Sequence, residues 1–152
     1  MAITNKQTWL WMVVVSVMLL LSGCGKGTKT LDLKPETGEA VQATLDTGDD
    51  FDMEYTSGVL MVYQKKKVMM QVAFLNEEQR QGQLARMRNG NMSRVLKEEG
   101  KSISYEMASA QGLVNYYIFP VGEKTYAYGA TYLPPEGADK VWERLHFGGE
   151  KK

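Results

Sequence analysis

Apolar and polar residues alternate along several stretches of the chain, and this pattern constrains the fold more than any other feature. The clearest alternating stretches are residues 41–46, 51–55 and 101–109. A period of two places successive side chains on opposite faces of a β-strand, so these stretches predict half-buried strands. Residues 58–64 and 67–75 are more continuously apolar, which is typical of strands covered on both faces. The lysines between them predict a hairpin turn.

A further hairpin is predicted near the C-terminus. Residues 113–120 and 125–132 are rich in Tyr, Phe, Ile and Val, and the turn Val121–Gly122–Glu123–Lys124 separates them. If this turn brings Phe119 opposite Thr125, then Val114, Tyr116, Ile118, Tyr126 and Tyr128 share one face of the sheet.

Helix signals lie at two places. Asn76 is a suitable N-cap and Gln79 completes a capping box, which predicts a helix to about Arg88. We expect a second short helix over 92–99, although Asn89–Gly90 is also a strong hairpin signal, and two strands are the alternative. The last helix begins at the Pro134–Pro135 pair and ends before Gly148, with apolar residues at helical spacing. Within it, Trp142 is expected to anchor the helix on the sheet.

The predicted order is strands, helix, strands, helix. This order indicates the α+β class, with helices covering an antiparallel sheet, in a single domain over residues 40–147. The layout resembles the PsbP-like domains of small bacterial lipoproteins, over roughly the same residues and without a distinctive motif. No functional residue follows from that resemblance.

The N-terminus has the pattern of a secretory signal. Lys6 precedes an apolar run over 9–21 that only Ser16 interrupts. This run is shorter than the ~20 residues that a membrane-spanning helix needs. It ends in Leu21–Ser22–Gly23–Cys24, which resembles the lipobox of bacterial lipoproteins. The resemblance implies cleavage between Gly23 and Cys24 and a diacylglyceryl group on the Cys24 sulfur.

The signal therefore sets the predicted organisation of the chain. Residues 1–23 are the signal peptide, 24–39 the lipidated N-terminus with a flexible spacer, 40–147 the domain and 148–152 a short tail. Removing 23 of the 152 residues leaves 129, which suffices for one domain. We expect the domain outside the cytoplasm, lipid-anchored to the cell membrane or the outer membrane. In lipoproteins of double-membraned bacteria, an Asp directly after the lipidated Cys resembles an inner-membrane retention signal. Position 25 is Gly, which favours sorting to the outer membrane.

Charge and metal-ligand types narrow the function. The 18 basic and 18 acidic residues balance, which argues against nucleic acid as a partner. His146 is the only histidine and Cys24 the only cysteine, so a zinc site or a His-assisted nucleophile lacks its residues. The acidic run 46–54 lacks the order of an EF-hand loop, and the methionines that could bind Cu(I) lie on different predicted elements. We predict no metal and no cofactor beyond the covalent lipid.

The tyrosines are the remaining candidates for a site. Tyr116, Tyr126 and Tyr128 form either a contact surface or packing beneath a helix, since tyrosine suits interfaces and sheets equally. We therefore expect a non-catalytic binding or accessory domain of the cell envelope, whose partner is another envelope component or a small ligand. The alternatives are an envelope enzyme that uses carboxylate or Ser/Lys chemistry, and a purely structural envelope protein. None of the common nucleophile or phosphate-binding motifs is present to support the enzyme.

Overall fold

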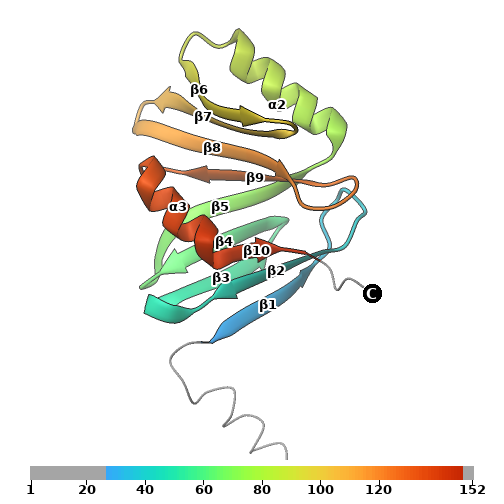
Figure 1. The fold of residues 1–152 in the computed structure, drawn as a ribbon, viewed down its shortest axis with the longest axis vertical. Coiled ribbons are helices and arrows are strands. Elements are labelled where there is room, and N and C mark those ends of the chain that lie inside the picture. Colours follow the sequence, from blue (N-terminus) through green and yellow to red (C-terminus); the bar gives the residue numbers. More distant parts are fainter. Residues whose placement is uncertain (1–26, 149–152) are drawn as a thin grey trace, which may run out of the picture.

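The computed structural model describes residues 27–148, and these residues form two antiparallel β-sheets with two α-helices. The larger sheet has seven strands in the order β3-β4-β5-β9-β8-β7-β6, and the smaller has three in the order β1-β2-β10 (Figure 1). The strands are β1 (Thr28–Leu33), β2 (Val41–Asp46), β3 (Phe51–Thr56), β4 (Val59–Gln64), β5 (Lys67–Leu75), β6 (Ser93–Glu99), β7 (Ser102–Ser109), β8 (Gly112–Pro120), β9 (Tyr126–Thr131) and β10 (Leu145–Phe147). The helices are α2 (Glu77–Asn89), α3 (Pro135–Arg144) and a 3₁₀ turn, η1 (Gly48–Asp50).

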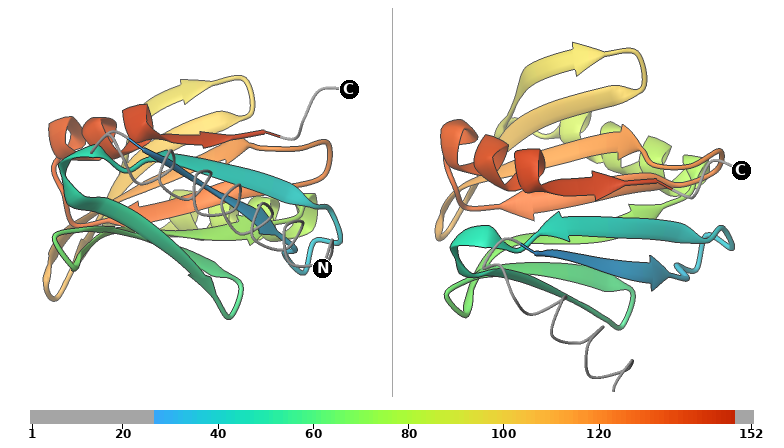
Figure 2. Two further views of the ribbon diagram at one scale, coloured as in Figure 1. Left: turned by 90° about the horizontal axis from the view of Figure 1, so that it is seen from below. Right: turned by 60° about the horizontal axis from the view of Figure 1, so that its bottom comes forward.

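The main core lies between the small sheet, α3 and one face of the large sheet (Figure 2). Alternate residues of β2 are buried and meet alternate residues of the large-sheet strands, as a period of two requires. The helix α3 contributes Ala138 and Val141, and β10 contributes Leu145. The fully buried members from the two sheets are Leu33, Ala43, Leu45, Met53, Leu60, Val62, Val72 and Ala127.

A second core lies on the opposite face of the large sheet, beneath α2. The helix buries Leu84 and Met87 against Leu75, Ile118 and Tyr126. The capping box predicted from the sequence is present: Asn76 and Gln79 each accept a hydrogen bond from the other's backbone N–H, at 2.8 and 2.9 Å.

The predicted α+β class with covering helices is wrong, because the protein is mostly β. Three segments that the sequence analysis assigned elsewhere are strands, and each completes a ladder. The predicted flexible spacer contains β1, whose residues pair with β2 from Thr28↔Asp46 to Leu33↔Val41. The domain thus begins at residue 28 rather than 40.

The predicted second helix is also a strand. Residues 93–99 form β6, the edge of the large sheet, and pair with β7 through a hairpin whose turn contains Gly100 at φ 58°. The prediction was wrong because residues 94–99 include good helix formers. Pairing with the neighbouring strand β7 outweighs this helix propensity. The alternative, a hairpin with its turn at Asn89–Gly90, is also wrong as a pairing, because the residues before this turn form α2, and only the strand after it is present.

The C-terminal helix ends one turn earlier than predicted. Leu145, His146 and Phe147 form β10, which pairs with β2 and joins the helix to the small sheet. His146 therefore lies in a strand opposite Thr44, not in the last turn of a helix.

The predicted hairpins are confirmed, with two differences. β4 and β5 are joined at Lys65–Lys66 as expected, but their burial alternates, so they are not covered on both faces. In the β8–β9 hairpin Phe119 pairs with Ala127 rather than Thr125. Because this shift is of two residues, the predicted division of side chains between the two faces holds.

Candidate functional site

The three tyrosines predicted as a site lie on the α2 face of the large sheet. Tyr126 is buried, at 5% exposure, and belongs to the core beneath α2. Tyr116 and Tyr128 are half-buried and pack against that core. The structure thus brings the three together, with Tyr126 as packing and the other two at the margin of the helix.

Tyr116 is the middle ring of a stack of three. Its ring centroid lies 5.1 Å from that of Tyr105 and 5.5 Å from that of Tyr128, with interplanar angles of 18° and 14°. Burial raises the pKa of the Tyr105 hydroxyl far above its usual value, and a hydrogen bond to Tyr128 raises it further. The hydroxyls of Tyr105 and Tyr128 are therefore neutral and bonded to each other, as expected for groups that pack in a core.

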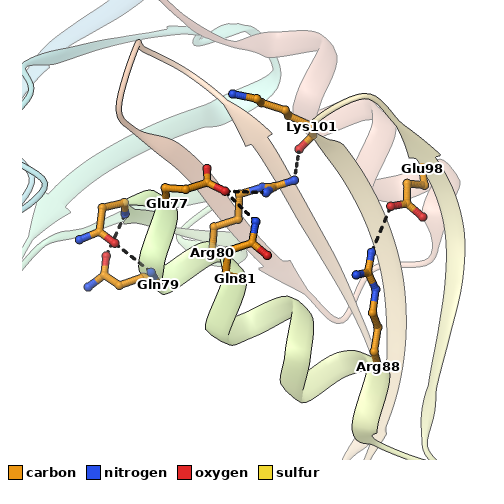
Figure 3. Close-up of polar contacts among 8 residues, drawn as sticks. Glu77, Gln79, Arg80, Gln81, Arg88, Glu98 and Lys101 are labelled. Carbon is orange, nitrogen blue, oxygen red and sulfur yellow. Dashed lines mark hydrogen bonds and ion pairs between the residues drawn. The ribbon is translucent and has the colours of Figure 1, made fainter.

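A buried arginine, Arg80, contacts residues of α2 and of the β6–β7 turn (Figure 3). The guanidinium of Arg80 contacts Glu77 at 3.2 Å, donates to the carbonyl of Lys101 at 3.3 Å, and lies over the Tyr126 ring at 4.9 Å. The Tyr126 hydroxyl bonds to Glu77 and, with Gln81, lowers the pKa of that carboxyl. These contacts join the start of α2 to the β6–β7 turn and to β9, so the arginine has a structural role.

Of the other residues singled out from the sequence, some lie outside the described residues and others form contacts with basic side chains. Cys24 and Gly23, the predicted lipidation and cleavage residues, lie outside the described residues. In the acidic run, Asp46 and Asp49 contact Arg144, and Asp52 contacts Lys29 at 2.8 Å. Within residues 27–148 no group of three or more His, Cys, Asp or Glu side chains is placed to hold a metal ion.

A groove lies on the opposite face of the large sheet, beside α3. Its floor consists of two rows of side chains that cross three strands. Tyr117 of β8, Ser104 of β7 and Lys97 of β6 form one row, because Tyr117 pairs with Ser104 and Ser104 with Lys97. Two residues along each strand, Phe119, Ser102 and Glu99 form the other. From β8 through β7 to β6, the floor therefore changes from aromatic rings to hydroxyl groups and then to charged side chains.

The wall of the groove is the side of α3. Trp142 packs edge-on against the floor aromatics, with ring centroids 5.5 Å from Tyr117 and 5.1 Å from Phe119. Asp139 lies one turn earlier on the same side of the helix and also lines the groove. The cavity measures about 520 Å³, within the range of small-molecule sites.

The groove carries charged and hydrogen-bonding groups. Lys97 and Glu99 lie 3.6 Å apart as an exposed ion pair, whereas Asp139 forms no ion pair with any residue of the described part of the chain. Burial raises the pKa of Tyr117, and the charge of Asp139 raises it further, so this hydroxyl is a neutral donor. Such a lining suits recognition of a ligand that has both an apolar and a hydroxyl-bearing or cationic side.

The sequence predicted that Trp142 packs on the sheet, but it did not predict the groove. It missed Lys97 and Glu99 because it placed them on a helix, and Ser102 and Ser104 because they alternate with a core-facing row and looked like its solvent side. The signal that could have found them is the pairing of residues 93–99 with 102–109 across Gly100.

Comparisons with known proteins do not place the chain in a family: no family model, no curated protein and no solved structure matches it. Among residues 27–148, no helix is long and apolar enough to cross a membrane.

Proposed function

We propose that this protein is a lipid-anchored lipoprotein of the bacterial cell envelope whose β domain is a non-catalytic binding module. The anchor rests on the sequence Leu21–Ser22–Gly23–Cys24 behind a short apolar run. The binding role rests on one observation, the groove between Trp142 and the β6–β8 strands. Its size fits a small ligand or a short segment of a partner.

The arrangement of α3 supports the groove as a binding site. The helix is fixed by Ala138 and Val141 in the main core, and by Arg144, which bonds to the carbonyl of Gly48 at 3.0 Å. The groove wall is therefore held on rigid elements, and its geometry needs little ordering when a ligand binds. A preformed groove with an aromatic floor and a polar rim is typical of recognition sites.

The anchor is tested with a labelled fatty acid in a bacterial host. The natural chain should incorporate the label and shift in mass by the lipid, whereas Cys24→Ala should do neither. Incorporation into the Cys24→Ala chain would show that the lipobox assignment is wrong.

The binding role is tested by a photo-crosslinking amino acid placed at Ser104, on the groove floor, in the full chain in intact cells. A matched control carries the same residue at Glu78, which is exposed on α2 on the other face of the sheet. We expect a defined adduct from position 104 and none from position 78. Asp139→Arg, which fills and recharges the groove from an exposed helix position, should abolish the adduct. Equal labelling from both positions would argue against the groove as the site.

A further inference from the structure

One end of the strands gathers most of the exposed apolar side chains. The antiparallel pairings place the starts of β1, β3, β5, β6 and β8 at the same end, together with the ends of β2, β4, β7 and β9 (left in Figure 1). We call this the anchor end. Six large hydrophobic side chains of residues 27–148 are exposed, and four of them lie here: Val68 42%, Met92 63%, Leu113 54% and Tyr132 61%.

These four side chains are neighbours across the sheet. Leu113 pairs with Ala108, whose N–H donates to the Met92 carbonyl at 3.1 Å. The Tyr132 hydroxyl bonds to Gln111, in the turn that precedes Leu113. Val68 and Tyr132 line one groove. Exposed apolar residues that lie together on a soluble domain usually mark a contact surface.

A lysine turn lies beside them. Lys65 and Lys66 form the β4–β5 turn with φ of 49° and 64°, and Lys67 follows. Two successive residues at positive φ usually mean Asn-Gly, so lysines in these positions cost backbone energy. None of the three forms an ion pair within the part of the chain that the structure describes, whereas nearby Asp49 and Asp52 are engaged by Arg144 and Lys29.

The chain enters the domain at this same end. The Gly27 carbonyl accepts a hydrogen bond from Thr47 N–H at 2.9 Å, and β1 begins at the next residue. Only three residue steps separate Gly27 from Cys24, and they span at most about 11 Å. A lipid on Cys24 therefore holds the anchor end at the membrane surface, with no long spacer between them.

We propose that the anchor end lies directly against an anionic phospholipid surface. Met92, Leu113, Tyr132 and Val68 then contact the headgroup region, and the lysine turn faces the lipid phosphates. The inference rests on the proposed lipidation of Cys24. It also leaves the Trp142 groove accessible from the aqueous side, because Glu99, Ser102 and Phe119 lie toward the opposite ends of their strands.

Lipid-proximity quenching of the reconstituted, full lipoprotein tests this orientation. Because Cys24 is the only cysteine and its sulfur carries the lipid, a cysteine introduced by Leu113→Cys or Glu123→Cys can be labelled alone with a fluorophore. Leu113 is the second residue of β8 and Glu123 lies three residues beyond the last, so the two positions lie about 30 Å apart. In phosphatidylglycerol-containing vesicles with a nitroxide on the headgroups, we expect several-fold stronger quenching at 113 than at 123. Equal quenching of the two probes would overturn the inference.

The lipid on Cys24 is measured first by mass, so the two proposals fail differently. A chain without the lipid contradicts the proposed function before any vesicle is made. A lipidated chain with equal quenching contradicts only the orientation.

The lysine turn provides a second variant that is not expected to unfold. Lys65→Asn with Lys66→Gly suits the positive φ values better, so this variant should be at least as stable as the natural protein. With the probe at 113, the double variant should show weaker quenching in phosphatidylglycerol vesicles and lose its dependence on salt. In phosphatidylcholine vesicles it should match the natural turn. Unchanged quenching and salt dependence in the anionic vesicles would contradict the role of these lysines.

Discussion

The indole of Trp142 occupies the space that a side chain at Gly129 would need. A Cβ on Gly129 would lie 2.5 Å from Cζ2 and 2.8 Å from Cη2 of the indole. The helix α3 can lie this close to the large sheet because β9 has a glycine at the point of contact. The Trp142 groove therefore depends on a residue that does not line it.

Gly129→Ala should destabilise the domain by ~1–3 kcal/mol, because the added methyl group forces the indole away from the sheet. Urea unfolding followed by circular dichroism measures this change. Gly82→Ala is the matched control, since a Cβ there meets nothing within 4 Å and the residue lies inside α2. That control should gain up to ~1 kcal/mol from helix propensity. A Gly129→Ala protein as stable as the natural one would contradict the close contact.

Trp142→Ala should cost ~3–5 kcal/mol, because it removes the aromatic contacts with Tyr117 and Phe119 and leaves a cavity. The two substitutions should also be coupled: Gly129→Ala should cost less in the Trp142→Ala protein than in the natural one. A loss below ~1 kcal/mol for Trp142→Ala would mean that the indole contributes little to packing.

Arg80 and Arg88 offer a comparison between a buried and an exposed arginine on one helix (Figure 3). The Arg80 side chain is 11% exposed, whereas Arg88 and its partner Glu98 are 58% and 52% exposed. Arg80→Ala should destabilise the domain by ~2–4 kcal/mol, because it leaves the Lys101 carbonyl without its donor and a void beside Tyr126. Arg88→Ala should cost less than ~1 kcal/mol. Equal losses in urea unfolding would show that the guanidinium of Arg80 is not a central contact.

The sequence predicted most strands and both long hairpins correctly, because alternation is a local signal that pairing across the sheet reinforces. The sequence also predicted α2, because Asn76 and Gln79 form its capping box. The wrong predictions concern segments whose structure is determined by pairing with another strand. Three segments were missed because they have no strong alternation or contain good helix formers: residues 28–33, 93–99 and 145–147. Each of them pairs with the edge of a neighbouring strand.

The groove could not be predicted for the same reason. Its floor depends on the register of β6 against β7 and of β7 against β8, and its wall depends on α3 crossing over Gly129. A tryptophan at helical spacing predicts that α3 packs on the sheet, but not which strands lie beyond the helix. The register therefore had to come from the structure.

The ion pair between Lys29 and Asp52 joins β1 to β3, and it predicts a pH dependence of stability. The hydrogen bond from Lys29 lowers the pKa of Asp52 below its usual value, against an opposing effect of burial, and the N–H of Met53 lowers it further. Because the folded-state pKa is depressed, the stabilisation is present above the unfolded pKa of about 3.9 and is lost as the pH falls through the lower folded value. The difference in urea midpoint between the natural protein and Asp52→Asn should therefore be largest near pH 6 and shrink below pH ~4. A difference that stays constant down to pH ~3 would contradict this linkage.

Substitutions of the three tyrosines on the α2 face should differ in how much they destabilise the domain. Tyr126 is buried beneath Arg80, so Tyr126→Ser should cost ~3–5 kcal/mol, as for other large aromatic truncations. Tyr116→Ser and Tyr128→Ser remove half-buried rings of the stack with Tyr105, and each should cost less than the change at Tyr126. Tyr126→Phe keeps the ring and loses only the hydroxyl that bonds to Glu77, so it should retain most of the stability. Urea unfolding of the four variants ranks these losses, and the adduct from a crosslinker at Ser104 should persist in every variant that folds, because the groove lies on the other face. If Tyr116→Ser or Tyr128→Ser left stability unchanged and abolished that adduct, the binding surface would lie on the tyrosine face and not beside Trp142.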